Sequence, residues 1–168
     1  MAIYGGIIGA VITAIVFCHK RKVVFLDLID FLIPYLALGQ AIGRWGNFVN
    51  QEAYGYMTDS FLKMRIFDES LGMFVDVHPT FLYESLLDFF IFILFTFLRK
   101  RRQFLGQLLY IYMILYGSGR AFIEGLRTDS LMFGNFRVSQ VLSIIFVLMG
   151  CILYGHVEYC RRKGKNVD

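Results

Sequence analysis

The chain of 168 residues is strongly apolar and weakly charged. Apolar residues make up 57% of it, charged residues make up 18%, and the mean hydropathy is +0.59. This composition is typical of a polytopic membrane protein and excludes an ordinary soluble domain. The net charge of +4 comes from basic clusters beside apolar blocks. Because no basic stripe carries interleaved aromatic residues, we expect no nucleic-acid partner.

Five apolar blocks predict an all-α fold, a polytopic membrane helical bundle of about five transmembrane helices in a single domain over residues 1–168. The predicted spans lie near residues 2–18, 23–43, 80–98, 104–122 and 138–157. Each approaches the roughly 20 residues that a helix needs to cross the hydrocarbon core of a bilayer. We expect residues 44–79 to form an exterior segment and residues 158–168 a C-terminal tail.

The basic residues predict the orientation of these spans. Eleven of the 17 lysines and arginines follow the first, third and fifth blocks, namely Lys20, Arg21, Lys22, Arg99, Lys100, Arg101, Arg102, Arg161, Arg162, Lys163 and Lys165. Cytoplasmic segments carry an excess of such residues, so this side, with the C-terminus, is predicted to be cytoplasmic. No basic residue precedes the first block, as one would in a signal peptide, so we interpret that block as a span.

The most informative motif is GRWGNFVNQEAYG, residues 43–55, directly after the second block. It places Arg44, Asn47, Asn50 and Glu52 at a membrane boundary. The planar guanidinium group of arginine donates several hydrogen bonds at once and therefore suits a phosphate. The motif predicts a polar pocket for an anionic, phosphate-bearing ligand.

A second motif, YGSGRAFIEGLR, ends the fourth block. Tyr116, Arg120, Glu124 and Arg127 follow one another at spacings of four, four and three, which predicts one helical face. A charged side chain at the centre of a membrane helix costs roughly 2.5–3.5 kcal/mol, so this face should point toward protein or water. The alternative is a purely structural ion pair between Arg120 and Glu124 at the outer boundary.

A third motif, HPTFLYES, opens the third block with His78, Tyr83 and Glu84. By itself it is compatible with a structural histidine and an interfacial tyrosine as well as with a site. Two carboxylates lie in the second block. We expect Asp27 at a helix start and expect the deeper Asp30 to pair with another polar residue.

Cysteines and histidines are too scattered to form a metal site. Cys18, Cys151 and Cys160 lie far apart or outside any Cys/His ligand spacing, and the histidines are not clustered. We expect neither a metal nor a cofactor.

Together the three motifs closely resemble the bacterial prolipoprotein diacylglyceryl transferase family. Its patterns GRxGNFxNxExxG, HPSxLYE and YGxxRxxxExxR occur in the same order, and the likeness runs from IYGGIIGA at the start to VSQVLS. Family members resemble proteins of seven spans, of which this chain supplies what look like the last five. Tyr4 stands where many members have a histidine.

The resemblance implies transfer of the diacylglyceryl group from phosphatidylglycerol to a preprolipoprotein thiol, in the bacterial cell membrane and without a cofactor. The implied partners are phosphatidylglycerol, membrane lipid, and signal peptides that carry a lipobox cysteine. The catalytic candidates are Arg44, Arg120, Glu52, Glu124, Tyr116, His78 and Tyr4. The substrate-binding candidates are Arg44, Asn47, Asn50, Tyr83, Glu84 and Arg127.

Residue chemistry fits this reaction. An arginine near a thiol favours the thiolate, which is the nucleophile. The leaving phosphate gains charge as its C–O bond breaks, so Arg44 and Arg120 suit its stabilisation. Two alternatives remain open: an N-terminally truncated, non-catalytic lipid-binding remnant, and a small polytopic transporter.

Overall fold

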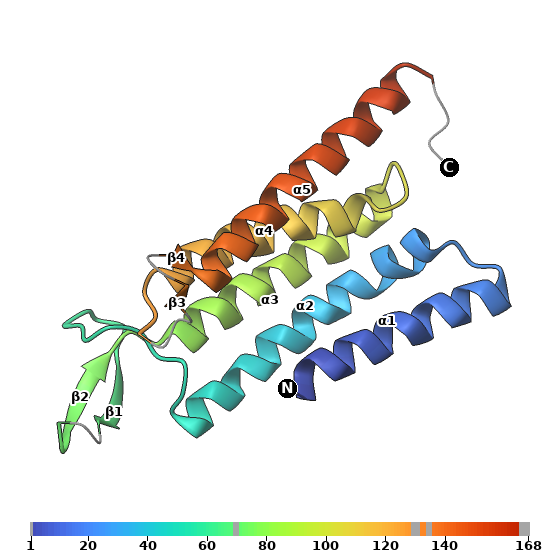
Figure 1. Cartoon of the computed structure of the whole chain (residues 1–168). Helices are drawn as coiled ribbons and strands as arrows, with labels where there is room; N and C mark the ends of the chain where they lie inside the picture. Colours follow the sequence, from blue (N-terminus) through green and yellow to red (C-terminus); the bar gives the residue numbers. More distant parts are fainter. Residues whose placement is uncertain (1, 69–70, 129–131, 134–135, 165–168) are drawn as a thin grey trace.

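The structure is a computed structural model that describes residues 2–68, 71–128, 132–133 and 136–164, with the side chains of residues 2–4, 7, 133 and 136 outside the described set. Helices dominate it (Figure 1). They are α1 (Ala2–Arg21), α2 (Phe25–Asn50), α3 (Thr80–Leu98), α4 (Gln107–Glu124) and α5 (Val138–Arg162), with a short 3₁₀ helix η1 (Arg99–Arg101) after α3.

The polytopic helical fold expected from the composition is confirmed. Among the described residues, α2, α3 continued by η1, and α5 are long and apolar enough to cross a membrane. Helix α4 is shorter and carries Arg120 and Glu124 near its end. Its polar face is turned toward neighbouring helices, where Glu124 is almost fully buried.

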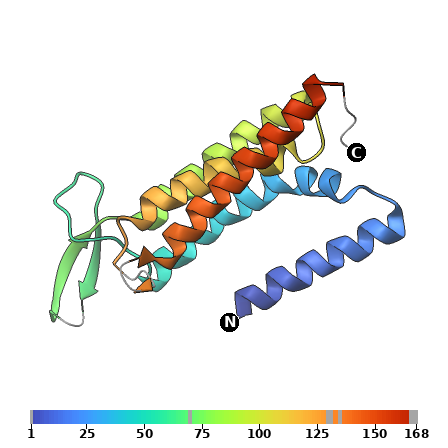
Figure 2. The ribbon, with the colours of Figure 1, turned by 45° about the horizontal axis from the view of Figure 1, so that its top comes forward.

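The central core lies between α2, α3 and α4, which run alternately up and down (Figure 1). It consists of Ile33, Ala37, Ile91, Phe95, Leu108 and Tyr112. Helix α5 packs on α4, whereas α1 lies beside α2 and apart from the rest of the bundle (Figure 2). Apolar side chains of α1 such as Ile8 and Ile12 are exposed.

Small residues bring α4 close to its neighbours. A Cβ atom on Gly117 would lie 2.8 Å from Val147 Cγ2, and one on Gly150 would lie 3.0 Å from the backbone oxygen of Tyr110. Such close approach is a common way for membrane helices to gain contact area. It holds α4 firmly between α3 and α5.

The segment between α2 and α3 contains a β-hairpin that the apolar pattern did not predict. Strand β1 (Met64–Asp68) pairs antiparallel with β2 (Met73–Val77), in a register from Met64 opposite Val77 to Asp68 opposite Met73. Met64, Ile66 and Val77 pack with Phe81 at the start of α3. A shorter pair, β3 (Met132–Phe133) and β4 (Phe136–Arg137), precedes α5.

Asp76 on β2 secures this hairpin through ion pairs with Arg65 and Lys63. The hydrogen bond from Arg65, and then that from Lys63, holds the pKa of Asp76 below its ordinary value.

Several predicted boundaries differ from the observed ones. Helix α1 ends at Arg21, beyond the predicted residue 18, and α5 continues to Arg162, into the predicted tail. Helix α2 continues past residue 43 to Asn50, so Arg44 and Asn47 lie on its last turns and not in a loop. It ends where Gln51 adopts the left-handed conformation, with φ of 52°. Helix α4 ends at Glu124, so Arg127 lies in the following turn and not on the helical face. Hydropathy indicates only the apolar part of a helix. The helical hydrogen-bond pattern can continue beyond that part into polar residues.

The alternating helix directions place all three sequence motifs at one end of the bundle, beside the strands (Figure 1). The ends of α1, α3 and α5, where the basic residues follow, lie at the opposite end.

Candidate active site

The three motifs, far apart in sequence, meet through one carboxylate. Glu84 on α3 is 4% exposed. Its Oε2 atom lies 2.7 Å from Nε of Arg44 on α2, and its Oε1 atom accepts a hydrogen bond from Nη1 of Arg120 on α4. Glu84 thereby holds two guanidinium groups from two other helices. We call Arg44, Glu84, Arg120, Glu124 and Arg127 the Glu84 cluster.

Glu124 is the second carboxylate of the cluster. It is 1% exposed, and its Oε2 atom lies 3.3 Å from Nη2 of Arg120 and 4.0 Å from Nη1 of Arg127. The expected ion pair between Arg120 and Glu124 is therefore present, but it is one part of a larger network.

Arg137, just before α5, joins this network through the backbone. It donates hydrogen bonds to the carbonyl oxygen of Glu124 and, over 2.8 Å, to the hydroxyl of Tyr56. With Arg137 included, four guanidinium groups lie near three buried acidic side chains, those of Glu84, Glu124 and Asp88. The excess of positive charge suits an anionic ligand.

Tyr116 extends the cluster along α4. Its hydroxyl accepts a long hydrogen bond of 3.4 Å from Nη2 of Arg44. Its ring stacks on Tyr112, with 5.2 Å between centroids and an interplanar angle of 7°. Tyr112 in turn donates to Gln40 on α2 over 2.7 Å. The guanidinium of Arg44 is thus oriented from both α3 and α4.

A pocket of about 210 Å³ opens beside Tyr116 and Arg120, between α4 and α5. Ser139 and Ser143 line its polar part, and Leu142 and Phe146 line its apolar part. Leu142 and Phe146 are also exposed on the outer face of α5. The pocket therefore extends from Arg120 to apolar side chains on the surface of α5.

His78 and Tyr83 form a separate pair. Nδ1 of His78 lies 3.2 Å from the hydroxyl of Tyr83. The backbone of His78 also accepts from Gly55 N–H over 2.9 Å and donates to the carbonyl of Tyr56 over 3.0 Å. These contacts tie the segment after α2 to the start of α3, and the described hydrogen bonds of the His78 ring lead to Tyr83 and not to the arginines.

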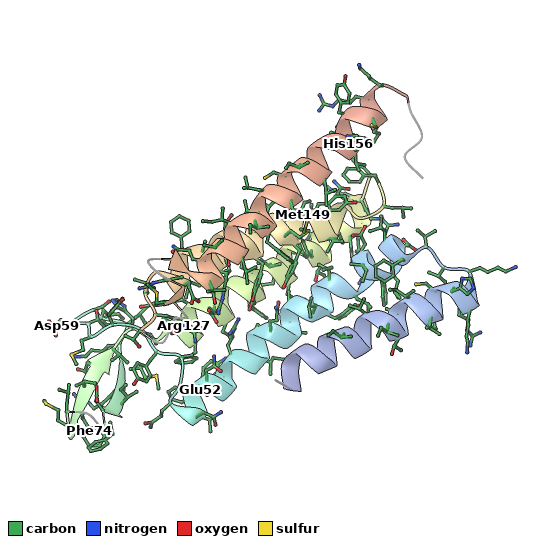
Figure 3. All side chains as sticks on the ribbon, in the orientation of Figure 1. Glu52, Asp59, Phe74, Arg127, Met149 and His156 are labelled. Carbon is green, nitrogen blue, oxygen red and sulfur yellow. The ribbon has the colours of Figure 1, made fainter. Side chains whose placement is uncertain are left out.

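Asn50 is the last residue of α2, and Glu52 lies just beyond it (Figure 3); both side chains are exposed. Nδ2 of Asn50 donates to Oε1 of Glu52 over 3.1 Å, so their described side-chain contact is with each other. Asn47 is half-buried one turn earlier on the same helix. The side chain of Tyr4 lies outside the described residues.

Two residues of this region were not among the predicted site residues. Asp88 on α3 is 1% exposed, and both its carboxylate oxygens lack a hydrogen bond among the described residues. It lies one helical turn after Glu84, so the spacing of four between two acidic residues inside an apolar block was a usable signal. Arg137 carried no comparable signal, because it contacts Glu124 through a backbone oxygen.

Known proteins match this chain over most of its length. The family described as prolipoprotein diacylglyceryl transferase matches residues 1–155. A phosphatidylglycerol–prolipoprotein diacylglyceryl transferase of Finegoldia magna is 55% identical over 154 residues, covering 91% of this chain and 60% of the relative. Proteins of the same name from Clostridium novyi and Listeria welshimeri are 46% and 49% identical, covering 91% and 94% of this chain and 61% and 60% of their own lengths.

The chain thus spans about 60% of the length of these curated relatives. Both the family match and the identities extend across the helices that carry the Glu84 cluster. The chain belongs to the prolipoprotein diacylglyceryl transferase family.

Proposed function

We propose that this chain carries the charge-stabilising site of an enzyme that transfers a diacylglyceryl group from phosphatidylglycerol to the lipobox cysteine thiol of a preprolipoprotein. In this reaction the thiol loses its proton, and sulfur forms a bond to the glyceryl carbon. The C–O bond to phosphate breaks, with its electron pair staying on the phosphate oxygen. The products are a thioether and glycerol 1-phosphate.

The observation that carries this proposal is the sharing of Glu84 by Arg44 and Arg120. One carboxylate partly neutralises and orients two guanidinium groups, and leaves further N–H donors on both for a ligand. The phosphodiester substrate carries one negative charge, and the phosphomonoester product acquires a second. Preorganised cations therefore stabilise the transition state more than the ground state.

The geometry suggests a division of roles. Arg44, oriented by Glu84 and Tyr116, binds the lipid phosphate, while Arg120 stabilises the charge that develops on it. Glu84 has both oxygens occupied by arginines. Oε2 of Glu124 lies 3.3 Å from Arg120 and 4.0 Å from Arg127 but has no hydrogen bond among the described residues, so of these two glutamates Glu124 is the better candidate to accept the thiol proton.

The remaining predicted site residues lie around the Glu84 cluster and have supporting roles in this proposal. Asn47, Asn50 and Glu52 at the end of α2 bind or position the glycerol headgroup, and His78 with Tyr83 holds the adjoining segment. Tyr4, at the start of α1, remains a candidate for headgroup hydrogen bonding. The pocket between α4 and α5 admits acyl chains laterally from the membrane, because its apolar side is exposed.

We further propose that all five helices cross the cytoplasmic membrane, with the C-terminus in the cytoplasm. The ends of α1, α3 and α5 meet at one end of the bundle, and the basic residues follow them there. This agrees with the excess of basic residues in cytoplasmic segments. The Glu84 cluster and the hairpin then lie on the outer side, where a translocated signal peptide presents its cysteine.

The test is thioether formation in vesicles. The purified chain is reconstituted with phosphatidylglycerol and a synthetic lipobox peptide, and the peptide mass is followed by mass spectrometry. A second preparation carries, in addition, the part of the Finegoldia magna relative that lies outside the match. A peptide whose cysteine is replaced by serine is the matched control for thiol transfer.

A mass gain of one diacylglyceryl group on cysteine, in either preparation, supports the enzyme. Retention of phosphatidylglycerol without this product in both preparations would identify a lipid-binding remnant. Movement of lipid or peptide across the vesicle membrane without covalent product would identify a transporter.

A further inference from the structure

A second pocket lies at the basic end of the bundle, opposite the Glu84 cluster. It has a volume of about 340 Å³. Arg99, Lys100 and Arg102, which follow α3, line it together with Asp27 and Asp30 of α2. Val23, Leu28, Phe31 and Leu108 form its apolar wall. A pocket with cations at one end and an apolar wall at the other is amphipathic.

The wall of this pocket is rigidly built around Asp30. The Asp30 carboxylate is 1% exposed and accepts hydrogen bonds from the backbone N–H groups of Gly106, over 2.8 Å, and Leu109, over 3.0 Å. Arg102 lies 2.6 Å from Asp27 and 3.5 Å from Asp30, which confirms the expected polar pairing of Asp30. Both acidic side chains are therefore already engaged within the protein.

Two cations remain for a ligand. Arg99 is exposed and donates over 3.1 Å to the hydroxyl of Tyr35 on the outer face of α2. Lys100 is exposed and forms no ion pair with any residue that the structure describes. The pocket thus offers a guanidinium and an ammonium group beside an apolar wall on which Phe31 is 58% exposed.

We propose that this pocket binds the phosphate headgroup of an anionic phospholipid, with Arg99 and Lys100 at the phosphate and an acyl chain along Phe31 and Leu28. Basic pockets between membrane helices are suited to such headgroups. A free phosphate would use the cations but gain nothing from the apolar wall. The bound lipid is a second molecule, separate from the one that enters the proposed transfer, since the two sites lie at opposite ends of the bundle.

Fluorescence quenching tests the proposal locally. Trp45, at the other end of α2, is the single tryptophan of the chain, so Trp45→Phe with Phe31→Trp moves the only tryptophan, which is excited selectively over the tyrosines, into the pocket. The protein is placed in phosphatidylcholine vesicles that contain brominated phosphatidylglycerol or, at the same mole fraction, brominated phosphatidylcholine. We expect stronger quenching by the brominated phosphatidylglycerol.

Charge variants then distinguish lipid binding in this pocket from a general attraction of anionic lipid to the basic surface. Arg99→Gln with Lys100→Gln should lower the local preference for phosphatidylglycerol by about fivefold for each cation removed. Arg161→Gln with Arg162→Gln is the matched control, because these arginines lie at the end of α5 and pair with Glu158. Lys100→Gln alone serves if the double variant misfolds, since exposed Lys100 can be lost without leaving a partner unpaired.

Equal quenching by the two brominated lipids, or a preference that survives removal of Arg99 and Lys100, would overturn the site. An equal loss in the Arg161/Arg162 control would overturn it in favour of general surface charge. Adding inorganic phosphate at constant ionic strength should leave the preference unchanged. Displacement by inorganic phosphate would assign the pocket to a soluble anion instead.

Discussion

At the scale of single residues, Glu84 sets the geometry of the candidate site. It is buried, belongs to α3, and contacts an arginine from each of two other helices. Removing one partner of a buried ion pair destabilises a protein far more than removing one partner of an exposed pair. Glu84 therefore links α2, α3 and α4 through ion pairs.

Replacing Glu84 should therefore be costly. Glu84→Gln leaves Arg44 and Arg120 without their shared carboxylate, and we expect a loss of about 3 kcal/mol in stability. Thermal unfolding in detergent measures it. Glu52→Gln is the control, because Glu52 is exposed and bonds only to Asn50 among the described side chains. Equal melting temperatures for the two variants would contradict the shared-carboxylate account.

The activity should require the planar shape of the Arg44 guanidinium group as well as its charge. Its Nε atom contacts Glu84 while Nη2 donates to Tyr116, an arrangement that a lysine ammonium cannot reproduce. We expect Arg44→Lys to insert normally and to lower the rate of thioether formation about 100-fold. Activity within a few-fold of wild type would remove Arg44 from the phosphate site.

At the scale of elements, Gly55 joins three segments behind the site. Its N–H donates to His78 O over 2.9 Å, and it bridges to Arg127 beyond α4. A Cβ atom at this position would lie 2.7 Å from Cβ of His78 and 2.8 Å from the carbonyl oxygen of Leu126. Neither neighbour is the flexible end of a side chain.

Gly55→Ala should accordingly destabilise the protein by about 1–3 kcal/mol through overcrowding. Gly46→Ala, in the same motif, is the matched control because a Cβ atom there meets nothing within 4 Å. The comparison uses melting temperatures of both variants. A Gly55→Ala protein as stable as the Gly46→Ala protein would show that the segments around Gly55 can move apart to accommodate a methyl group.

Most elements were predictable because bilayer thickness imposes long apolar blocks. The block at residues 80–98 coincides with α3, and every other block lies largely within a helix. The hairpin was missed because Met64–Asp68 and Met73–Val77 are short strands inside a mixed segment. Their pairing depends on packing against Phe81, which no local pattern expresses.

The same limit applies to the site. The residue types of the site, and its place at one end of the bundle, followed from motifs and spacing. That Glu84 and not Glu52 contacts Arg44 depends on how α2 and α3 are rotated against each other, since both carboxylates occur in recognisable motifs. Asp88 likewise lies beside the cluster only because α3 turns that face inward.

At the scale of the whole molecule, the bundle separates two ends of different chemistry. The Glu84 cluster and the hairpin occupy one end, and the basic ends of α1, α3 and α5 occupy the other. This separation is the basis of the proposed orientation. It also places the proposed lipid pocket and the proposed active site at opposite ends of the bundle.

Cysteine labelling of intact cells checks the orientation. In a background without Cys18, Cys151 and Cys160, we expect Asp59→Cys to react with an impermeant reagent and Lys165→Cys to stay unmodified. After the cells are opened, both positions should react. Labelling of position 165 but not 59 in intact cells would reverse the proposed topology.

The central claim is that Arg120, held by Glu84 and Glu124, stabilises the charge that develops on the leaving phosphate. The most direct measurement is thioether turnover and phosphatidylglycerol binding, side by side, on folded Arg120→Ala protein that carries the additional length of the Finegoldia magna relative. The account predicts turnover lowered about 100-fold or more, with lipid binding reduced only slightly. Unchanged turnover would contradict it and leave Arg120 as a structural ion-pair partner.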